Sequence, residues 1–349
     1  MLQGETVVLT RFQLRDILSA TDNFSETHCI GLHEYGTMYK ADLYDFVDKS
    51  SLAFEEKDRP KTCITVAIKR ISSSRDAEER FFSEIDMHTK RKHSNIASLL
   101  GFCDEGDEII LVFEHGSNRG LDDYLKNIAN MDNFEWTQRL HVCLGIANGL
   151  NHLHTKMDMQ ERIIYRDIRS ANILLGENWE PKISYFGISN FHLANQKEST
   201  LTRKQVYWDP EFEKTRITKR KSDIYSFGVI LFKIFCGQLA YDPIYLDEND
   251  KQLTPIALNH FNDGTIEKLL DPRLKEVTHD ADIVALNRGP NQDSLDTFLK
   301  VAYQCLEEAQ AKRPTMESVI KELEIALNLQ VSQYFRSITF FLFFLFFYH

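Results

Sequence analysis

The sequence lacks several features that would assign it to common classes of protein. Its six cysteines show no close pairing, which argues against a disulfide framework or a cysteine zinc site and suits reduced thiols in a cytosolic protein. Basic residues are the minority, 41 against 52 acidic ones, and the formal net charge of −11 disfavours nucleic-acid binding. The first residues have no basic flank followed by a long apolar core, so no signal peptide is expected.

Long hydrophobic runs are also missing, except near the C-terminal end. Residues 338–348 are apolar or aromatic apart from Thr339. As a helix this run would be roughly 16 Å long, about half the ~30 Å hydrocarbon thickness of a bilayer, so it should not span a membrane alone. Three interpretations stay open: a weak interfacial membrane anchor, a segment buried against the protein, or a sequence absent from the mature protein.

The sequence contains enough apolar residues for a large folded protein. With 349 residues and 43% hydrophobic content, the chain can bury one large core or two lobes. Residues 12–24 form a short amphipathic pattern, which we interpret as a helix packed on the following lobe rather than as a docking segment. Further along we expect β-like runs around Gly31 and Gly36, a strand over 62–70, a helix over 77–92 and strands over 96–102 and 108–114.

Helical periodicity dominates after the small turn residues of 116–120, which mark a boundary between two lobes. Apolar residues fall on one stripe from Trp136 to Leu150, and we expect that stripe to be core. We interpret His152 and His154, at the end of this helix, as packing or surface residues and not as metal ligands.

Five motifs occur in an order that chance would not produce. They are Leu-Gly-Phe-Cys-Asp-Glu-Gly (100–106), Tyr-Arg-Asp-Ile-Arg-Ser-Ala-Asn (165–172), Trp-Asp-Pro-Glu-Phe (208–212), Lys-Ser-Asp-Ile-Tyr-Ser-Phe-Gly-Val (221–229) and Arg-Pro-Thr-Met (313–316). With Val-Ala-Ile-Lys ending at Lys69, they make residues 12–330 resemble a protein kinase domain, closest to plant receptor-like kinases and receptor-like cytoplasmic kinases. The resemblance implies an α+β, two-lobed kinase fold, with a small β-rich N-lobe carrying one main helix and a larger helical C-lobe.

On this resemblance the chain divides into four parts. They are an N-terminal flanking helix (1–25), a kinase-like N-lobe (26–116), a kinase-like C-lobe (117–330) and an aromatic C-terminal tail (331–349).

The resemblance also implies roles for individual residues. Lys69 would contact the α- and β-phosphates of ATP and be held by an ion pair with Glu84. Asp167 would orient or deprotonate a substrate hydroxyl, and Arg169 would place a cation near the γ-phosphate. Asn172 would hold one metal ion. The implied nucleotide-binding residues are Ile30, Gly31, Gly36, Met38, Ala67, Lys69, Phe113, Glu114, His115 and Leu174.

Several positions depart from the family pattern. Tyr185 stands where the family has the aspartate that holds magnesium, and a tyrosine hydroxyl with a pKa of about 10 is neutral at about pH 7. His33 replaces the middle glycine of the phosphate loop, where backbone must approach phosphate closely. Tyr165 replaces a histidine, and Arg169 replaces a lysine whose ammonium geometry a planar guanidinium does not reproduce. These changes argue against Mg²⁺-dependent phosphoryl transfer of the ordinary kind.

Motifs that stabilise the fold depart less from the family pattern than the motifs for metal and substrate do. By resemblance, Asp223 would tie its helix to the backbone of the loop around Asp167, and Arg313 would pair with Glu211. His88 falls where the family has an aliphatic residue. Hydroxyls of the following activation segment, which are Ser189, Ser199, Thr200 and Thr202, are candidate phosphorylation sites.

Two functional hypotheses remain after the sequence is read. The first is a pseudokinase that signals by docking to an active receptor-like kinase or another signalling protein, with or without ATP. The second is an active serine/threonine kinase that phosphorylates protein or peptide substrates slowly through the retained Lys69, Glu84, Asp167 and Asn172. Either would work in the cytoplasm or at the cytoplasmic face of the plasma membrane, without a nucleic-acid partner.

Overall fold

The computed structural model describes residues 9–33, 36–44, 63–115, 120–126, 134–155, 163–184, 207–238, 253–274 and 289–347. Within these ranges, the side chains of His33 and of residues 333–347 are not described. The chain divides into two compact units, Met1–Ser117 and Asn118–His349. The first unit is built mainly on a sheet and the second mainly on helices, so the predicted α+β class, with a β-rich first part and a helical second part, is confirmed.

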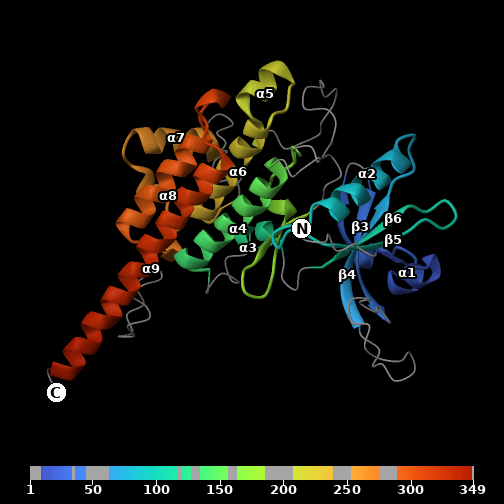
Figure 1. Ribbon diagram of the computed structural model, residues 1–349, viewed down its shortest axis with the longest axis horizontal. Helices are drawn as coiled ribbons and strands as arrows, with labels where there is room; N and C mark the ends of the chain where they lie inside the picture. The colour runs from blue at the N-terminus through green and yellow to red at the C-terminus, as the bar shows by residue number, and fades with distance from the viewer. Residues whose placement is uncertain are drawn as a thin grey trace, which may run out of the picture. The chain divides into compact units, whose positions relative to one another are not determined.

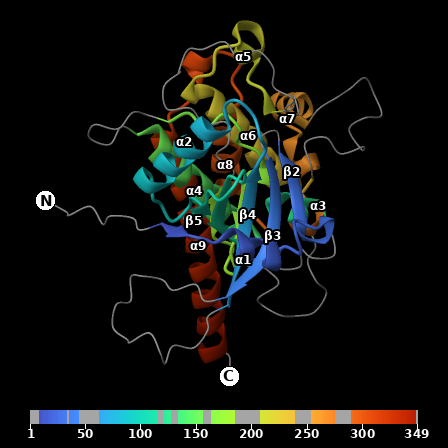
Figure 2. The ribbon, with the colours of Figure 1, turned by 90° about the vertical axis from the view of Figure 1, so that its right-hand side faces the viewer.

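The first unit contains a six-stranded sheet in the order β1-β5-β6-β4-β3-β2. All neighbouring strands are antiparallel except β1, which runs parallel to β5. Figure 2 shows the long strands β3 and β4 side by side. The elements are β1 (Thr10–Arg11), α1 (Leu14–Ala20), β2 (Cys29–His33), β3 (Gly36–Tyr44), β4 (Cys63–Ile71), α2 (Ala77–Lys90), β5 (Leu99–Cys103) and β6 (Ile110–Glu114).

One face of this sheet packs on α1. Alternate residues of β3, β4 and β6 form a hydrophobic cluster with Ile17 of α1, whose side chain is fully buried. Because side chains alternate across a strand, the remaining residues of the same strands lie on the opposite face, on which α2 lies. Figure 1 shows α1 and α2 on opposite sides of the sheet. Helix α1 is therefore part of the core of the first unit.

Strand β1 was not expected from the sequence. Its pairing places Thr10 opposite Gly101 of β5, and the amide of Phe12 donates to the carbonyl of Phe102 at 2.8 Å. A Cβ atom on Gly101 would lie 1.9 Å from the carbonyl oxygen of Thr10, so only glycine allows this strand to approach. A two-residue strand carries too little periodicity to be recognised in a sequence.

The second unit is a group of helices with one short hairpin, β7–β8. Among the helices, α9 makes the most extensive contacts, one with α4 and one with α8. Helix α6 packs on α8 and α4 (Figure 1). The elements are α3 (Leu121–Lys126), α4 (Trp136–His154), β7 (Ile173–Leu175), β8 (Pro181–Ile183), α5 (Pro210–Thr215), α6 (Arg220–Cys236), α7 (Leu253–Asn262), α8 (Gln292–Cys305) and α9 (Met316–Phe347).

Helix α4 carries the core stripe that the sequence predicts. Trp136, Leu140, Cys143 and Leu150 are buried, and the indole of Trp136 donates to Ser294 at the start of α8. The six cysteines are all free thiols, and four of them are buried. Burial raises the pKa of the Cys305 thiol to about 12, so it stays protonated at neutral pH.

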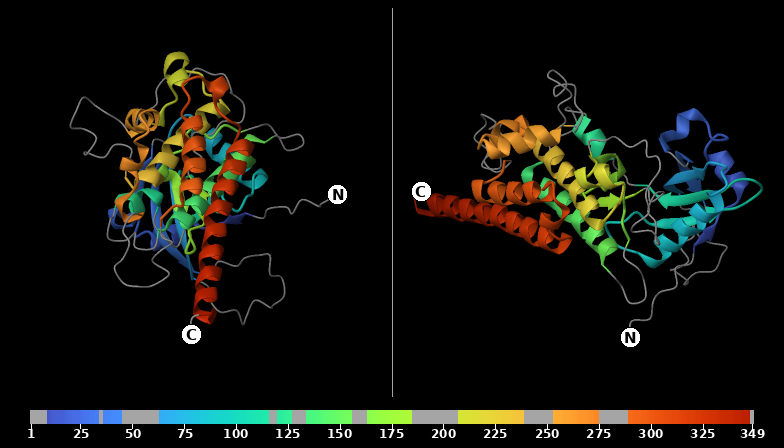
Figure 3. Two further views of the ribbon diagram at one scale, coloured as in Figure 1. Left: turned by 90° about the vertical axis from the view of Figure 1, so that its left-hand side faces the viewer. Right: turned by 90° about the horizontal axis from the view of Figure 1, so that it is seen from above.

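Helix α9 is the longest element and continues to Phe347. Figure 3 shows its first half alongside α8 and its C-terminal end extending past the other helices of the unit. Gln330 ties the helix to the unit, because its amide oxygen accepts from the amide of Asn291 at 2.8 Å and its NH₂ donates to the carbonyl of Gly289 at 3.0 Å. In the part of the chain that the structure describes, no helix is both long enough and apolar enough to cross a membrane.

Candidate functional site

The candidate nucleotide-binding residues of the first unit share one face of its sheet. In the strand register, Met38 lies opposite Lys69, and Ala67 lies opposite Phe113. Directly opposed residues of antiparallel strands point to the same face, as do residues two apart on one strand. Met38, Ala67, Lys69 and Phe113 therefore line the sheet face opposite the α1 cluster. The alternation of apolar residues alone could not show this, because both faces are buried.

Lys69 and Glu84 form a buried ion pair within this unit. The Lys69 Nζ atom lies 2.6 Å from Glu84 Oε2, and both side chains are almost fully buried. Glu84 reaches the lysine because it lies on the inward face of α2 with Phe81, Met87 and His88. The pair predicted by resemblance is thus present in the structure, and it fixes the lysine ammonium beside strand β4.

His88 packs one helical turn after Glu84. Its ring lies 5.0 Å from the ring of Phe113, centroid to centroid, at a tilt of 60°. Burial and, to a smaller extent, the ammonium of Lys69 lower the pKa of His88 to about 3. The imidazole is therefore neutral at physiological pH and acts as a packing group beside the Lys69–Glu84 pair.

In the second unit, Asp223 of α6 organises the loop 163–172. Its carboxylate accepts from the backbone amides of Tyr165 at 2.9 Å and Arg166 at 2.8 Å, and from His154 Nε2 at 2.8 Å. Arg166 has a φ of 71°, a left-handed conformation that is costly for a residue with a side chain. The three hydrogen bonds to one buried carboxylate compensate for that cost. The expected tie between Asp223 and the loop is present, whereas the contribution of His154 was not foreseen.

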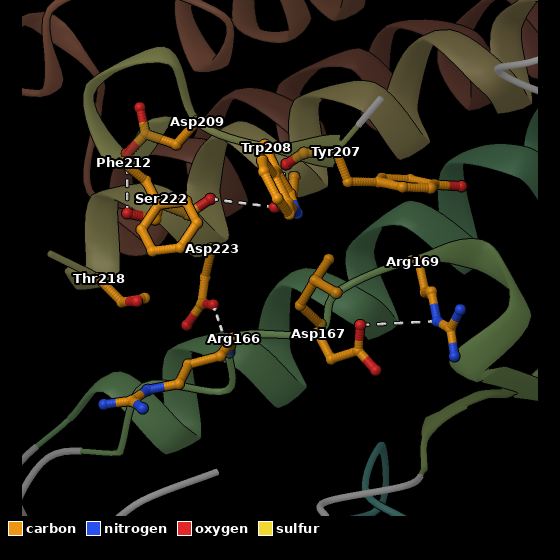
Figure 4. A pocket seen from close by; sticks show the side chains of 12 residues that line it. Arg166, Asp167, Arg169, Tyr207, Trp208, Asp209, Phe212, Thr218, Ser222 and Asp223 are labelled. Atoms are coloured by element: carbon orange, nitrogen blue, oxygen red, sulfur yellow. Dashed lines mark hydrogen bonds and ion pairs between the residues drawn. The ribbon is translucent and has the colours of Figure 1, made fainter. Parts of the chain in front are cut away.

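Asp167, Arg169 and Asn172 come together at the end of the same loop. The Asn172 amide nitrogen donates to Asp167 Oδ2 and to the Asp167 carbonyl, both at 2.9 Å. Arg169 Nε lies 3.3 Å from Asn172 Oδ1 and 3.6 Å from Asp167 Oδ1 (Figure 4). Asp167 is only partly buried, so its carboxylate can accept a hydrogen bond from an approaching hydroxyl, as a general base must.

Of the metal ligands that the family pattern implies, the structure describes Asn172. Magnesium prefers oxygen ligands that include carboxylates, and the Oδ1 atom of Asn172 accepts from Arg169 Nε at 3.3 Å. Within the described ranges, no cluster of three or more His, Cys, Asp or Glu side chains could hold a metal ion. Tyr185, the residue at the expected ligand position, lies outside the described residues. Its phenol would add no negative charge at neutral pH.

Tyr165 is a buried aromatic residue of the same loop. Its side chain is fully buried, and its hydroxyl donates to the carbonyl of Ser184, the residue before Tyr185. Burial and the nearby Asp167 raise the pKa of the Tyr165 phenol, which keeps it protonated as a donor. Ser184 in turn donates from its amide and from its hydroxyl to the carbonyl of Asn172, at 3.0 Å each. The tyrosine thus braces the loop against the β7–β8 hairpin through its own hydrogen bond.

One predicted contact is wrong. Arg313 does not pair with Glu211 but with Asp209, at 2.6 Å, in a fully buried ion pair. Burial alone would raise the pKa of Asp209, but Arg313 together with Ser222 and Gln310 outweighs it and lowers that pKa. Glu211 instead pairs with Lys219 at 2.9 Å near the surface. Both acids belong to one motif, and spacing alone could not show which of them faces the interior.

A polar cluster around Lys233 was missed in the sequence because a lysine within an apolar helix gives no signal of its partners. Lys233 Nζ lies 2.8 Å from Asp122 Oδ1 and 2.8 Å from the Tyr207 hydroxyl, and it also donates to Ser170. Burial alone would lower the pKa of Lys233, but Tyr207 and Asp122 outweigh it and raise that pKa. The lysine is therefore a buried cation that links α6 and α3 to the loop 163–172 and to Tyr207.

The remaining predicted residues are placed as follows. Ile30 and Gly31 lie in β2, with Ile30 exposed; Gly36 begins β3; Glu114 ends β6 with His115 next to it; and Leu174 is buried in β7. Burial lowers the pKa of His115. The side chain of His33, all of Tyr185 and the candidate phosphorylation sites at 189, 199, 200 and 202 lie outside what the structure describes, as does most of the predicted boundary at 116–120.

Comparisons with known proteins agree with this arrangement. The sequence model of the protein kinase domain family matches residues 51–323. Receptor-like protein kinase ANXUR2 of Arabidopsis thaliana is 33% identical over 323 residues, which cover 92% of this chain and 34% of that protein. Receptor-like protein kinase ANXUR1 of the same organism is 32% identical, with the same two shares covered. The chain spans about a third of the length of the curated relatives it matches. With its sheet, its Lys69–Glu84 pair and its Asp223-braced loop, this chain belongs to the protein kinase family.

Proposed function

We propose that this protein is a pseudokinase, a signalling protein of the kinase family that acts by docking to an active receptor-like kinase or to another signalling protein. The observation that carries the proposal is Tyr185, which stands at the position of the family's metal-binding aspartate. A neutral phenol cannot replace a carboxylate as a ligand of a hard, divalent cation. Without that metal, charge on the transferring phosphoryl group has lost its main stabilising partner.

The geometry of the loop 163–172 supports this proposal. Arg169 directs Nε at the amide oxygen of Asn172, which is the other metal ligand implied by the family pattern. A guanidinium at that oxygen competes with a cation for the same lone pairs. His33, at the position of a loop glycine, adds a side chain where phosphate would approach the backbone. The changes thus gather at groups that would handle phosphate and metal, whereas the buried ion pairs that serve the fold are intact.

ATP binding without catalysis is part of the proposal. The Lys69–Glu84 pair leaves an ammonium positioned for phosphate oxygens, and Met38, Ala67 and Phe113 offer an apolar sheet face for a base. Ile30, Gly31, Gly36, Glu114 and His115 would complete the binding residues that the first unit contributes. On this view ATP stabilises a conformation that a partner recognises, and Mg²⁺ contributes little.

A second candidate is an active serine/threonine kinase of low rate. Lys69, Glu84, Asp167 and Asn172 are all retained, and the Asp167 carboxylate is accessible enough to accept a hydroxyl proton. In this case Arg169 would supply the cation that stabilises the charge on the γ-phosphate. The substrates would be hydroxyl side chains of proteins or peptides. This candidate needs a metal site that the described side chains do not supply.

Phosphate incorporation decides between the two. Purified full-length protein, incubated with labelled ATP and Mg²⁺, is expected to incorporate no more phosphate than the Asp167→Asn variant, because that variant removes only the proposed base. The asparagine is nearly isosteric, so the two proteins should unfold at similar temperatures. Clear incorporation by the wild type that Asp167→Asn abolishes would establish the active kinase and reject the pseudokinase.

For the location of the protein, we propose the cytoplasmic face of a membrane, reached through weak binding of residues 338–348. The helix α9 carries this segment past the other helices of its unit (Figure 1), and a helix without a polar face needs an apolar environment on all sides. A single short apolar segment gives marginal, reversible binding, so partners would provide the remaining affinity.

Truncation tests this location. A version that ends at Ser332 keeps the Gln330 contacts to Asn291 and Gly289 and removes only the segment that follows. We expect part of the full chain to sediment with membranes and the truncated version to stay in the supernatant. Equal thermal stability of the two proteins is the control, and identical distributions would exclude the membrane anchor.

A further inference from the structure

Strand β1 and helix α1 belong to one segment, residues 10–21, which we call the strap; the rest of the first unit is its body. β1 pairs with β5 of the body, and the Arg11 guanidinium lies 2.8 Å from the carboxylate of Asp104. The Leu14 amide donates to the carboxylate of Glu105 at 3.0 Å. These two partners follow the strap residues by 93 and 91 positions in the chain. Tertiary contacts, and not neighbours in the sequence, therefore hold the strap in place.

The body has a surface that fits the strap closely. A Cβ atom on Gly101 of β5 would lie 1.9 Å from the carbonyl oxygen of Thr10, so the approach of β1 requires glycine there. Ile17 of α1 is fully buried in the apolar cluster on one face of the sheet, the face on which α1 lies (Figure 1). With seven residues, α1 is too short to persist in water by itself. The strap is therefore expected to keep its structure only while it is docked on a body.

Three consecutive residues in the left-handed conformation connect the strap to its body, and we call them the hinge. Their φ angles are 47° for Asp22, 54° for Asn23 and 59° for Phe24. Left-handed residues other than glycine normally occur singly, and a bulky side chain such as that of phenylalanine is an outlier there. Thr21, immediately before the hinge, is fully buried and donates to the carbonyl of Ile17 at 2.7 Å. The hinge thus begins at a residue that is fixed on the strap.

The hinge ends at a side chain that is fixed on the body. The ring of Phe24 lies 5.1 Å from the ring of Tyr39 on β3, centroid to centroid, and 4.4 Å from the Arg70 guanidinium on β4. Glu108 holds that guanidinium, with Arg70 Nε 2.7 Å from Glu108 Oε2. Because both ends are anchored, the backbone strain of the hinge cannot relax while the strap lies on its own body.

We propose that two copies of this chain exchange their straps, so that residues 10–21 of each copy dock on the body of the other. The exchanged dimer keeps every contact between strap and body, because an identical chain offers identical surfaces. Only the hinge differs, since in the dimer it is extended and its residues return to the ordinary β region. Relief of strain in two hinges opposes the entropy cost of association. A second copy is the natural partner, because its body reproduces every contact that the strap makes.

Crosslinking between chains tests the exchange. One full-length chain carries Arg11→Cys, and a second, with a different affinity tag, carries Asp104→Cys. Both carry Cys29→Ser and Cys63→Ser, which remove the two thiols that are not buried. The chains are co-expressed, so that exchange can occur during folding. The thiol crosslinker is the shortest one that joins the two positions when a single chain carries both substitutions in dilute solution. Purification through both tags should yield a covalent heterodimer.

Substitutions at Asn23 change the strain of the hinge in opposite directions. This residue is exposed, so its replacement leaves the contacts between strap and body intact. Asn23→Val places a β-branched side chain in the left-handed region, and with two hinges in each dimer it should raise the association constant about tenfold. Asn23→Gly removes the steric penalty and should lower that constant about fivefold. Sedimentation at several protein concentrations measures the constants, and the crosslinked yields should follow the same order.

A control and two contrary results make the test decisive. Asn178→Val makes the same change at an exposed turn residue of the second unit whose φ is not positive, so it should alter neither the association constant nor the crosslinked yield. A dimer that sediments but does not crosslink would show association through another surface and reject the exchange. Equal crosslinked yields for Asn23→Val and Asn23→Gly would also reject it, because random collisions between chains do not depend on the hinge. Neither readout involves phosphate incorporation, so the inference stands or falls separately from the proposed function.

Discussion

Replacing Lys233 by methionine is expected to lower the free energy of unfolding by about 3–5 kcal/mol, the usual cost of removing one partner from a buried ion pair. Methionine matches the lysine stem in length but leaves Asp122, Ser170 and Tyr207 without their common donor. The loss should be large because Lys233 is fully buried, so water cannot replace the ammonium. Chemical denaturation of the purified protein measures the change.

Three comparisons make this prediction specific. The double variant Lys233→Met with Asp122→Leu removes both charges and should recover much of the lost stability, while Lys300→Met on the exposed face of α8 should cost less than about 0.5 kcal/mol. The pKa of Lys233 is raised in the folded state, so its contribution is complete below the ordinary lysine value of 10.5 and is lost as pH rises through the folded value. The stability gap between wild type and Lys233→Met should therefore be constant at neutral pH and shrink above about pH 10.5. A loss below about 1 kcal/mol would show that the cluster is not a buried ion pair in solution.

Replacing Tyr185 by aspartate is expected to create a Mg²⁺-dependent response to ATP. In the wild type, ATP should raise the unfolding temperature by the same amount with Mg²⁺ or with EDTA, because the phenol adds no ligand charge. In the aspartate variant a carboxylate becomes available to the metal. A tenfold gain in affinity for the Mg²⁺ complex of ATP is about 1.4 kcal/mol and should raise the unfolding temperature by about 2–3 °C.

Two further substitutions control this experiment. Tyr185→Phe removes only the hydroxyl and Tyr185→Asn supplies an amide oxygen without charge, so neither should produce a difference between Mg²⁺ and EDTA. A wild-type response that already depends on Mg²⁺ would contradict the proposed loss of the metal site. So would an aspartate variant that stays indifferent to the metal, because the position would then not face bound nucleotide.

Much of the fold could be predicted because local patterns carry it. The stripe from Trp136 to Leu150 has a helical period and is buried in α4, and the β-rich run ending at Lys69 is strand β4. The Lys69–Glu84 pair and the role of Asp223 could be expected from motifs whose residues keep their order along the chain. In each case the information lies within a window that periodicity or a motif covers.

Contacts between distant segments could not be predicted in the same way. Two acids, Asp209 and Glu211, stand two residues apart, and only the packing of α5 against the 310–313 turn decides that Asp209 meets Arg313. In the sequence, Lys233 is a charged residue within an apolar helix and nothing indicates its partners. In the structure, Asp122, Ser170 and Tyr207 from three other segments surround its ammonium.

The sequence by itself determined the family of this protein and the chemical identity of Tyr185, because both depend on which residues occur in which order. Tertiary structure alone decided which charges are paired and which remain available. It buried Asp209 against Arg313, and it placed Asp122 and the Tyr207 hydroxyl beside the ammonium of Lys233. The physical reason is that pairing depends on distances between segments far apart in the chain, which no local pattern encodes.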